Sequence, residues 1–118
     1  MFIAPIIIAA VALIVVAITI ACARGTIPVN SLAGIRLRTV MINDSTWRAG
    51  HRAALPAELI GAGATVVVAL AALVVPSSDT AQLLSIGGTV ILLGSTVIAG
   101  FVANRAALTE LVAEQAAE

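Results

Sequence analysis

The side chains that can do chemistry are concentrated in one short stretch, GIRLRTVMINDSTWRAGHR, which runs from Gly34 to Arg52. It holds four of the six arginines of the chain, its one histidine, His51, and its one tryptophan, Trp47. Guanidinium groups bind carboxylates and phosphates, and an imidazole can exchange a proton near neutral pH. The stretch is therefore the first candidate for a binding site. Its cationic side chains are Arg36, Arg38, Arg48 and Arg52.

The sequence patterns of common enzymes and metal sites are absent from the chain. There is no GxSxG, no HExxH and no phosphate-binding loop. The single cysteine, Cys22, cannot close a disulfide within the chain and forms no CxxC pair, so we expect a small apolar residue near a helix end. We expect no enzyme activity, no metal, no cofactor and no nucleic acid partner.

Composition assigns the chain to the membrane proteins. Its 118 residues are 61% hydrophobic and 10% charged, and the mean hydropathy is +1.16. An average soluble domain has a charged fraction of roughly 25%. We expect a single membrane domain over residues 1–118, with the lipid bilayer as its immediate surroundings.

Three segments are long and apolar enough to cross a bilayer, since about 20 helical residues span a hydrocarbon core roughly 30 Å thick. They cover residues 2–23, 57–75 and 82–103, approximately, and the second stops at Pro76. The predicted fold class is all-α. The expected architecture is an integral membrane bundle of three transmembrane helices, with a short interfacial helix before the second span.

The arginines also predict the orientation, because short loops rich in Lys and Arg stay in the cytoplasm. The basic loop 24–56 is expected inside. The loop at 76–81, whose only charge is Asp79, is expected outside, and Arg105 after the third span agrees. The amino terminus would then lie outside and the carboxyl terminus inside. The acidic tail 105–118 is expected to be a solvated, frayed helix end, with an extension of the third helix as the alternative.

A helix start is predicted inside the basic loop, in NDSTW. Asn43, Asp44 or Ser45 can accept a hydrogen bond from a free N–H of the first turn. Pro56 lacks the N–H that would bond the carbonyl of Arg52, so it predicts a kink, or a break between an interfacial helix and the span.

On this helix Trp47, His51 and Glu58 are spaced by four and seven residues, which places them within about 40° of one another. Glu58 is the intramembrane charge of the chain, and an ionisable group inside a span usually has a partner. Candidate partners are His51, Arg52 or an arginine of the loop. Two interpretations stay open: Glu58 lies at the water interface and caps the helix dipole, or it is a buried group that links loop to bundle or serves transport or signalling.

Small residues spaced by four predict close helix packing within the bundle, with a homodimer as the alternative. The pairs are Ala57 with Gly61, Ser95 with Ala99, and Thr96 with Gly100.

The string NSLAGIRLRTVMINDSTWRAGHRAA, Asn30 to Ala54, resembles the signature of the SdpI family, bacterial membrane proteins named for an immunity protein against a secreted killing-factor toxin. The chain departs from the signature at Leu37, Arg38 and Thr39, where many members have Thr-Pro-Trp or a similar turn. The positions that match are Asn30, Gly34, Ile35, Arg36, Trp47, His51 and Arg52.

The resemblance implies a multi-pass protein of the bacterial cytoplasmic membrane that acts in toxin immunity or membrane signalling, by binding a peptide toxin or a cytoplasmic regulator. The matching residues, with Arg38 and Arg48, would form the partner-binding motif. Basic side chains there can dock an acidic partner or lipid headgroups.

Two other functions are compatible with the residues. One alternative is a small accessory subunit of a larger membrane complex, respiratory or envelope-forming, because the chain is small and its spans are rich in Ala and Gly. It can also be described as a small proton-coupled exporter that uses Glu58. Small exporters of comparable length have four spans, however, and three are predicted here.

Overall fold

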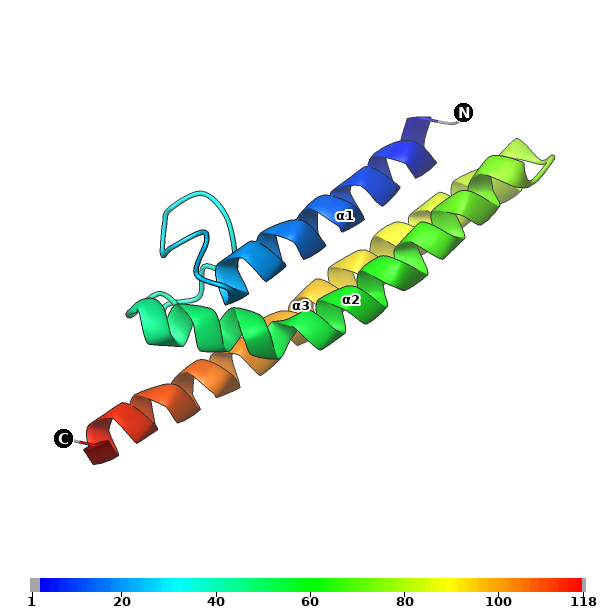
Figure 1. The fold of residues 1–118 in the computed structure, drawn as a ribbon. Coiled ribbons are helices and arrows are strands. Elements are labelled where there is room, and N and C mark those ends of the chain that lie inside the picture. Colours follow the sequence, from blue (N-terminus) through cyan, green and yellow to red (C-terminus); the bar gives the residue numbers. More distant parts are fainter. Residues whose placement is uncertain (1–2, 118) are drawn as a thin grey trace.

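The computed structural model describes residues 3–117, which form three helices (Figure 1). They are α1 (Ile3–Ala23), α2 (Asp44–Val74) and α3 (Ser78–Ala117). Each is long and apolar enough to cross a membrane. The predicted all-α class with three membrane helices is therefore confirmed. Phe2, at the start of the first expected span, and Glu118, at the end of the acidic tail, lie outside the described residues.

The three helices form an elongated bundle of 62 × 21 × 17 Å, and α2 packs between α1 and α3. Helix α2 runs antiparallel to both neighbours and packs on each of them, whereas α1 and α3 touch little (Figure 1). The turn between α2 and α3 lies at the same end as the start of α1. The long loop between α1 and α2 and the end of α3 lie together at the opposite end.

Small residues fill the inside of the bundle and large aliphatic residues cover its outside. One buried cluster consists of one residue from each helix: Ala12 of α1, Ala62 of α2 and Leu92 of α3. Leu13 is 62% exposed and Leu93 is 61% exposed. This arrangement reverses that of a soluble bundle, because the lipid is itself apolar and helices associate through close backbone approach.

Helix α2 begins at a capping box. The side-chain oxygen of Asn43 accepts a hydrogen bond from the Thr46 N–H at 2.9 Å, and the Thr46 hydroxyl accepts one from the Asn43 N–H at 3.1 Å. The helix ends at Val74, because Val75 precedes Pro76 and takes an extended conformation with ψ of 140°. The helix start predicted in NDSTW is thus present.

The separate interfacial helix expected before the second span is not confirmed, since α2 is continuous from Asp44 to Val74 with Pro56 inside it. Pro56 is exposed, so the Arg52 carbonyl that its ring leaves without a backbone donor lies on the outer side of the helix. Figure 1 shows that α2 changes direction between its first turns and its apolar part. The proline is accommodated by this bend, and the helix does not break.

Helix α3 extends to Ala117, so the tail is a continuation of the third helix and the expectation of a frayed end is wrong. At 1.5 Å per residue the helix is about 60 Å long, twice the roughly 30 Å hydrocarbon core. Two contacts order its last part: Ala107 is fully buried, and the Asn43 amide donates to the Glu114 carboxylate at 3.1 Å. The tail therefore packs against the start of α2.

The α2–α3 contact depends on glycine. A Cβ atom on Gly61 would overlap the side chain of Ser95, so the two helix backbones approach closely at this level. One turn further, the Thr65 hydroxyl is bonded to the carbonyls of Gly61, at 2.8 Å, and of Gly88 on the facing helix, at 3.2 Å. The predicted small-residue pairs containing Gly61 and Ser95 are thus used within the bundle.

Candidate functional site

The side chain of Asn30 organises the backbone of the loop between α1 and α2. Its Oδ1 atom accepts hydrogen bonds from the backbone N–H groups of Leu32 and Ala33, both at 2.8 Å. Its Nδ2 atom donates to the carbonyls of Pro28, at 2.8 Å, and Ala33, at 3.2 Å. One amide therefore organises the turn that leads to Gly34, as asparagine does in turns generally.

Gly34 is required for two independent reasons. Its φ angle is +104°, in the region that residues with a side chain rarely adopt. A Cβ atom at this position would also lie 2.8 Å from two ring carbons of Trp47 and 2.9 Å from Nε2 of His51. The backbone of Gly34 thus rests directly against the first turns of α2.

His51 connects the loop to α2 through both ring nitrogens. The N–H of Ile35 donates to Nε2 at 2.8 Å, and Nδ1 lies 2.7 Å from the carbonyl oxygen of Trp47. A carbonyl oxygen can only accept, so Nδ1 carries the proton and Nε2 is the acceptor. His51 is fully buried. The arrangement holds a neutral imidazole with no nitrogen left for a ligand.

Trp47 completes the connection. The indole is 1% exposed and its N–H donates to the carbonyl of Ile27 at 2.8 Å. Its ring centroid lies 4.3 Å from that of His51, and it belongs to a buried cluster that includes Cys22 of α1 and Val40 of the loop. We call the group formed by Asn30, Gly34, Ile35, Trp47 and His51 the loop clasp.

The four arginines of the stretch, in contrast, are all exposed. Within residues 3–117, no hydrogen bond or ion pair ties any of their guanidinium groups to another side chain. The predicted site residues therefore fall into two groups, the inward-facing loop clasp and an outward-facing set that we call the arginine surface. The arginine surface consists of Arg36, Arg38, Arg48 and Arg52.

Glu58 is 1% exposed, and its Oε2 atom is buried without a hydrogen-bond partner among the described residues. The interpretation of Glu58 as a water-exposed cap is therefore wrong. His51 is not its partner, because both ring nitrogens are bonded elsewhere, and Arg52 is exposed. Trp47, His51 and Glu58 lie on one continuous helix, as their spacing requires, and all three are buried.

Sequence analysis did not identify the contact between Thr39 and Asn104 as part of the site. The Thr39 hydroxyl donates to Oδ1 of Asn104 at 2.6 Å, across 65 positions of sequence, and so ties the loop to α3. The available signal was an amide placed directly after the third apolar segment. Among residues 3–117, no three His, Cys, Asp or Glu side chains gather as a metal site would require.

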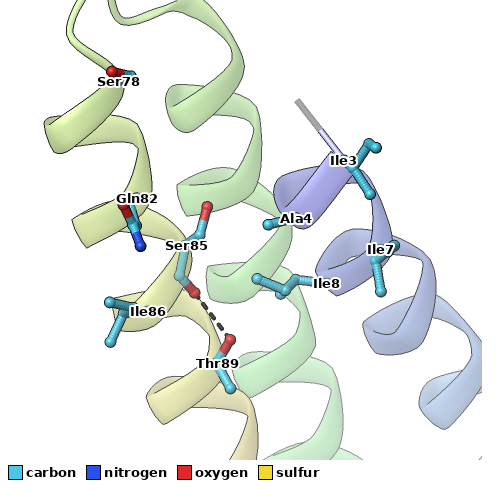
Figure 2. Close-up of a pocket in the computed structure, with 9 residues that line it drawn as sticks. All are labelled: Ile3, Ala4, Ile7, Ile8, Ser78, Gln82, Ser85, Ile86 and Thr89. Atoms are coloured by element: carbon cyan, nitrogen blue, oxygen red, sulfur yellow. Dashed lines mark hydrogen bonds between the residues drawn. The ribbon is translucent and has the colours of Figure 1, made fainter. Parts of the chain in front are cut away.

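Two of the grooves on the surface of the bundle are considered as binding sites. The α1–α3 groove, of about 780 Å³, lies between the first turns of α1 and of α3 (Figure 2). Its Ser85 and Thr89 hydroxyls donate to carbonyls of their own helix, each at 2.9 Å. The loop–α3 groove, of about 650 Å³, is at the opposite end. It lies between residues 34–37 and the face of α3 from Thr96 to Asn104.

One of the comparisons with known proteins found a match, which covers α2, most of the loop before it and most of α3. The family model described as the SdpI/YfhL protein family matches residues 26–104. The matched region contains the loop clasp, the arginine surface and both sides of the loop–α3 groove. No curated protein and no solved structure matches the chain.

Proposed function

The chain belongs to the SdpI/YfhL protein family, and from this membership we propose that it acts in toxin immunity or membrane signalling by binding a peptide or a cytoplasmic regulator, without catalysis. It is a multi-pass membrane protein with three apolar helices. Family membership supports immunity or signalling as the biological setting. The arrangement of the site residues supports binding as the mode of action.

The observation that carries the proposal is the division of the stretch into two groups. The loop clasp uses its polar atoms internally: the nitrogens of His51 and the indole N–H of Trp47 are all bonded to backbone. The arginine surface leaves its guanidinium groups exposed. A rigid support that presents unpaired cations suits recognition of an acidic partner, because arginine binds carboxylates through paired hydrogen bonds.

The charge distribution supports a cytoplasmic position for the arginine surface. Arg24 and Arg105 are also exposed at this end of the bundle, whereas the turn at the other end carries Asp79. Under the positive-inside rule the loop end faces the cytoplasm. The protein would thus lie in the bacterial cytoplasmic membrane with its amino terminus outside. The α1–α3 groove would then be open to a peptide arriving from outside.

A pull-down from native cells in mild detergent, followed by mass spectrometry, tests the proposal. Wild type would be compared with a variant in which Arg38, Arg48 and Arg52 are all replaced by glutamine. Arg105→Gln serves as the matched control, because Arg105 is exposed at the same end but lies outside the stretch. We expect a soluble regulator or a peptide to be recovered with wild type and with the control. The triple variant should not recover it.

Recovery of the same integral membrane proteins at a fixed ratio from all three samples would contradict the proposal. That result would instead make the chain an accessory subunit of a membrane complex, with the stretch serving the fold alone. Export through Glu58 is less well supported, because Glu58 lines neither of the two grooves.

A further inference from the structure

We propose that the loop–α3 groove binds one anionic glycerophospholipid, with an acyl chain along α3 and the phosphate at Arg36. This inference goes beyond the proposed function, which concerns a peptide or protein partner of the arginine surface. It gives Arg36 a lipid ligand, and the triple variant of the pull-down leaves Arg36 in place. It rests on the shape of the groove, on the order of its residues along the membrane normal, and on the exposed charge at its polar end.

The groove exists because a glycine lies beneath the loop. Residues 34–37 arch over α3 at Gly100, where a Cβ atom would lie 3.9 Å from the nearest methyl carbon of Leu37. A larger side chain on Gly100 would occupy this space. The volume of about 650 Å³ is sufficient for a substantial part of a lipid, within the range of roughly 300–1,000 Å³ usual for small-molecule sites.

The lining changes from apolar to polar along the helix. Val97 and Phe101, which are 59% and 70% exposed, form the part within the apolar segment. Arg36 and Asn104 form the part next to the end of that segment. Oδ1 of Asn104 already accepts from Thr39, which leaves the amide nitrogen of Asn104 as a donor. An amphiphile with an apolar chain and an anionic head has the same order.

The length of the groove corresponds to one leaflet. Thr96 and Asn104 are eight residues apart, a rise of about 12 Å along a helix. Half of a hydrocarbon core of roughly 30 Å is about 15 Å. A lipid whose phosphate lies level with Arg36 would therefore place its acyl chain beside Phe101 and Val97.

Two features of the lining select the occupant. The exposed apolar side chains favour an acyl chain, and the charge of Arg36 favours a lipid with net negative charge over a zwitterionic one. Val97 and Phe101 are exposed on the apolar part of α3, where lipid acyl chains surround a membrane helix. The Arg36 guanidinium is exposed and, within the described residues, unpaired. Guanidinium groups bind phosphate oxygens in pairs. The α1–α3 groove is larger, but none of the described residues that line it is charged, so these residues offer no such selectivity.

Native mass spectrometry of the full chain in detergent tests the inference, with phosphatidylglycerol and phosphatidylcholine of identical acyl chains as probes. We expect wild type to retain one phosphatidylglycerol and to bind it about fivefold more tightly than phosphatidylcholine. Both lipids offer a phosphate, but the choline cation of phosphatidylcholine cancels its net negative charge and repels the guanidinium group of Arg36. Arg36→Gln should abolish the preference. Gly100→Leu should weaken binding of both lipids about tenfold or more, because the leucine side chain fills the groove.

Two matched controls separate this effect from misfolding and from general electrostatics. Gly87→Leu places the same side chain on the same helix where nothing lies within 4 Å of the new Cβ atom. Arg24→Gln removes an exposed arginine that lies outside the arginine surface and does not line the groove. Both controls should bind phosphatidylglycerol as wild type does. Equal affinity of wild type for the two lipids, or unchanged phosphatidylglycerol binding by folded Gly100→Leu, would overturn the inference, whatever the pull-down shows.

Discussion

The backbone N–H of Ile35 donates a hydrogen bond of 2.8 Å to Nε2 of His51, sixteen positions later in the chain. This bond explains why a histidine occurs in so apolar a protein. The imidazole is a buried connector with one acceptor and one donor, and the second nitrogen is bonded to the carbonyl of Trp47 at 2.7 Å. The histidine therefore shapes the loop that carries the arginines.

Gly34→Ala should destabilise the protein by about 2 kcal/mol or more, because it combines a strained positive φ with overpacking against Trp47 and His51. Thermal unfolding in detergent measures the change. Gly63→Ala is the matched control, since a Cβ atom there meets nothing within 4 Å, and the alanine should leave stability equal or slightly raised. Equal melting temperatures for Gly34→Ala and wild type would contradict the positioning of the loop.

Asn30→Asp tests whether the amide donors of Asn30 matter as well as its acceptor. Aspartate keeps an oxygen for the N–H groups of Leu32 and Ala33, but it cannot donate to the carbonyls of Pro28 and Ala33. We expect a loss of about 1 kcal/mol. Asn30→Ala, which removes all four bonds, should unfold at a lower temperature than Asn30→Asp. An Asn30→Asp protein as stable as wild type would show that the donors do not order the turn.

Glu58→Leu should raise the melting temperature, because leucine removes a buried oxygen that has no partner among the described residues. Glu58→Gln keeps the size and the polarity of the side chain and is the matched control. A lower melting temperature for Glu58→Leu would mean that the carboxyl has a stabilising partner in the membrane, such as a bound water or a second protein. Loss of resistance or signalling in a stable Glu58→Gln protein would identify a functional carboxyl.

Gly61→Val should separate α2 from α3, since even a Cβ atom at this position overlaps Ser95. We expect a loss of about 3 kcal/mol or failure to form the native bundle. Gly63→Val introduces the same residue two positions later, on an exposed face, and should cost under about 1 kcal/mol. Similar behaviour of the two variants in thermal unfolding would contradict the close α2–α3 contact.

The helices and their order are predictable from the sequence, because long apolar segments and a capping residue such as Asn43 are local signals. The sequence did not distinguish a bend from a break at Pro56. The helix bends without breaking, because the missing hydrogen bond lies on the outer side of a packed helix. The end of α3 makes long-range contacts, such as the bond between Asn43 and Glu114, 71 positions apart. Local patterns carry no information on such a contact.

The sequence identified the residues of the candidate site, but it did not show which of them support the loop and which are exposed. The stretch identified Gly34, Trp47 and His51, yet their spacing could not show that the glycine backbone rests on both rings. That contact depends on the conformation of a loop without repeating structure. Exposure of the arginines is likewise a property of the folded loop, because an Arg beside Glu58 was an equally good interpretation of the sequence.

The central claim is that the loop clasp supports the fold while the arginine surface is free to bind. The most direct measurement compares the melting temperature of His51→Phe with that of the variant in which Arg38, Arg48 and Arg52 are glutamine. Phenylalanine leaves the Ile35 N–H without its acceptor, which should cost about 1–3 kcal/mol, whereas exposed substitutions typically change stability by about 0.5 kcal/mol or less each. We predict a lower melting temperature for His51→Phe and a nearly unchanged one for the arginine variant. Equal destabilisation of both would contradict the claim.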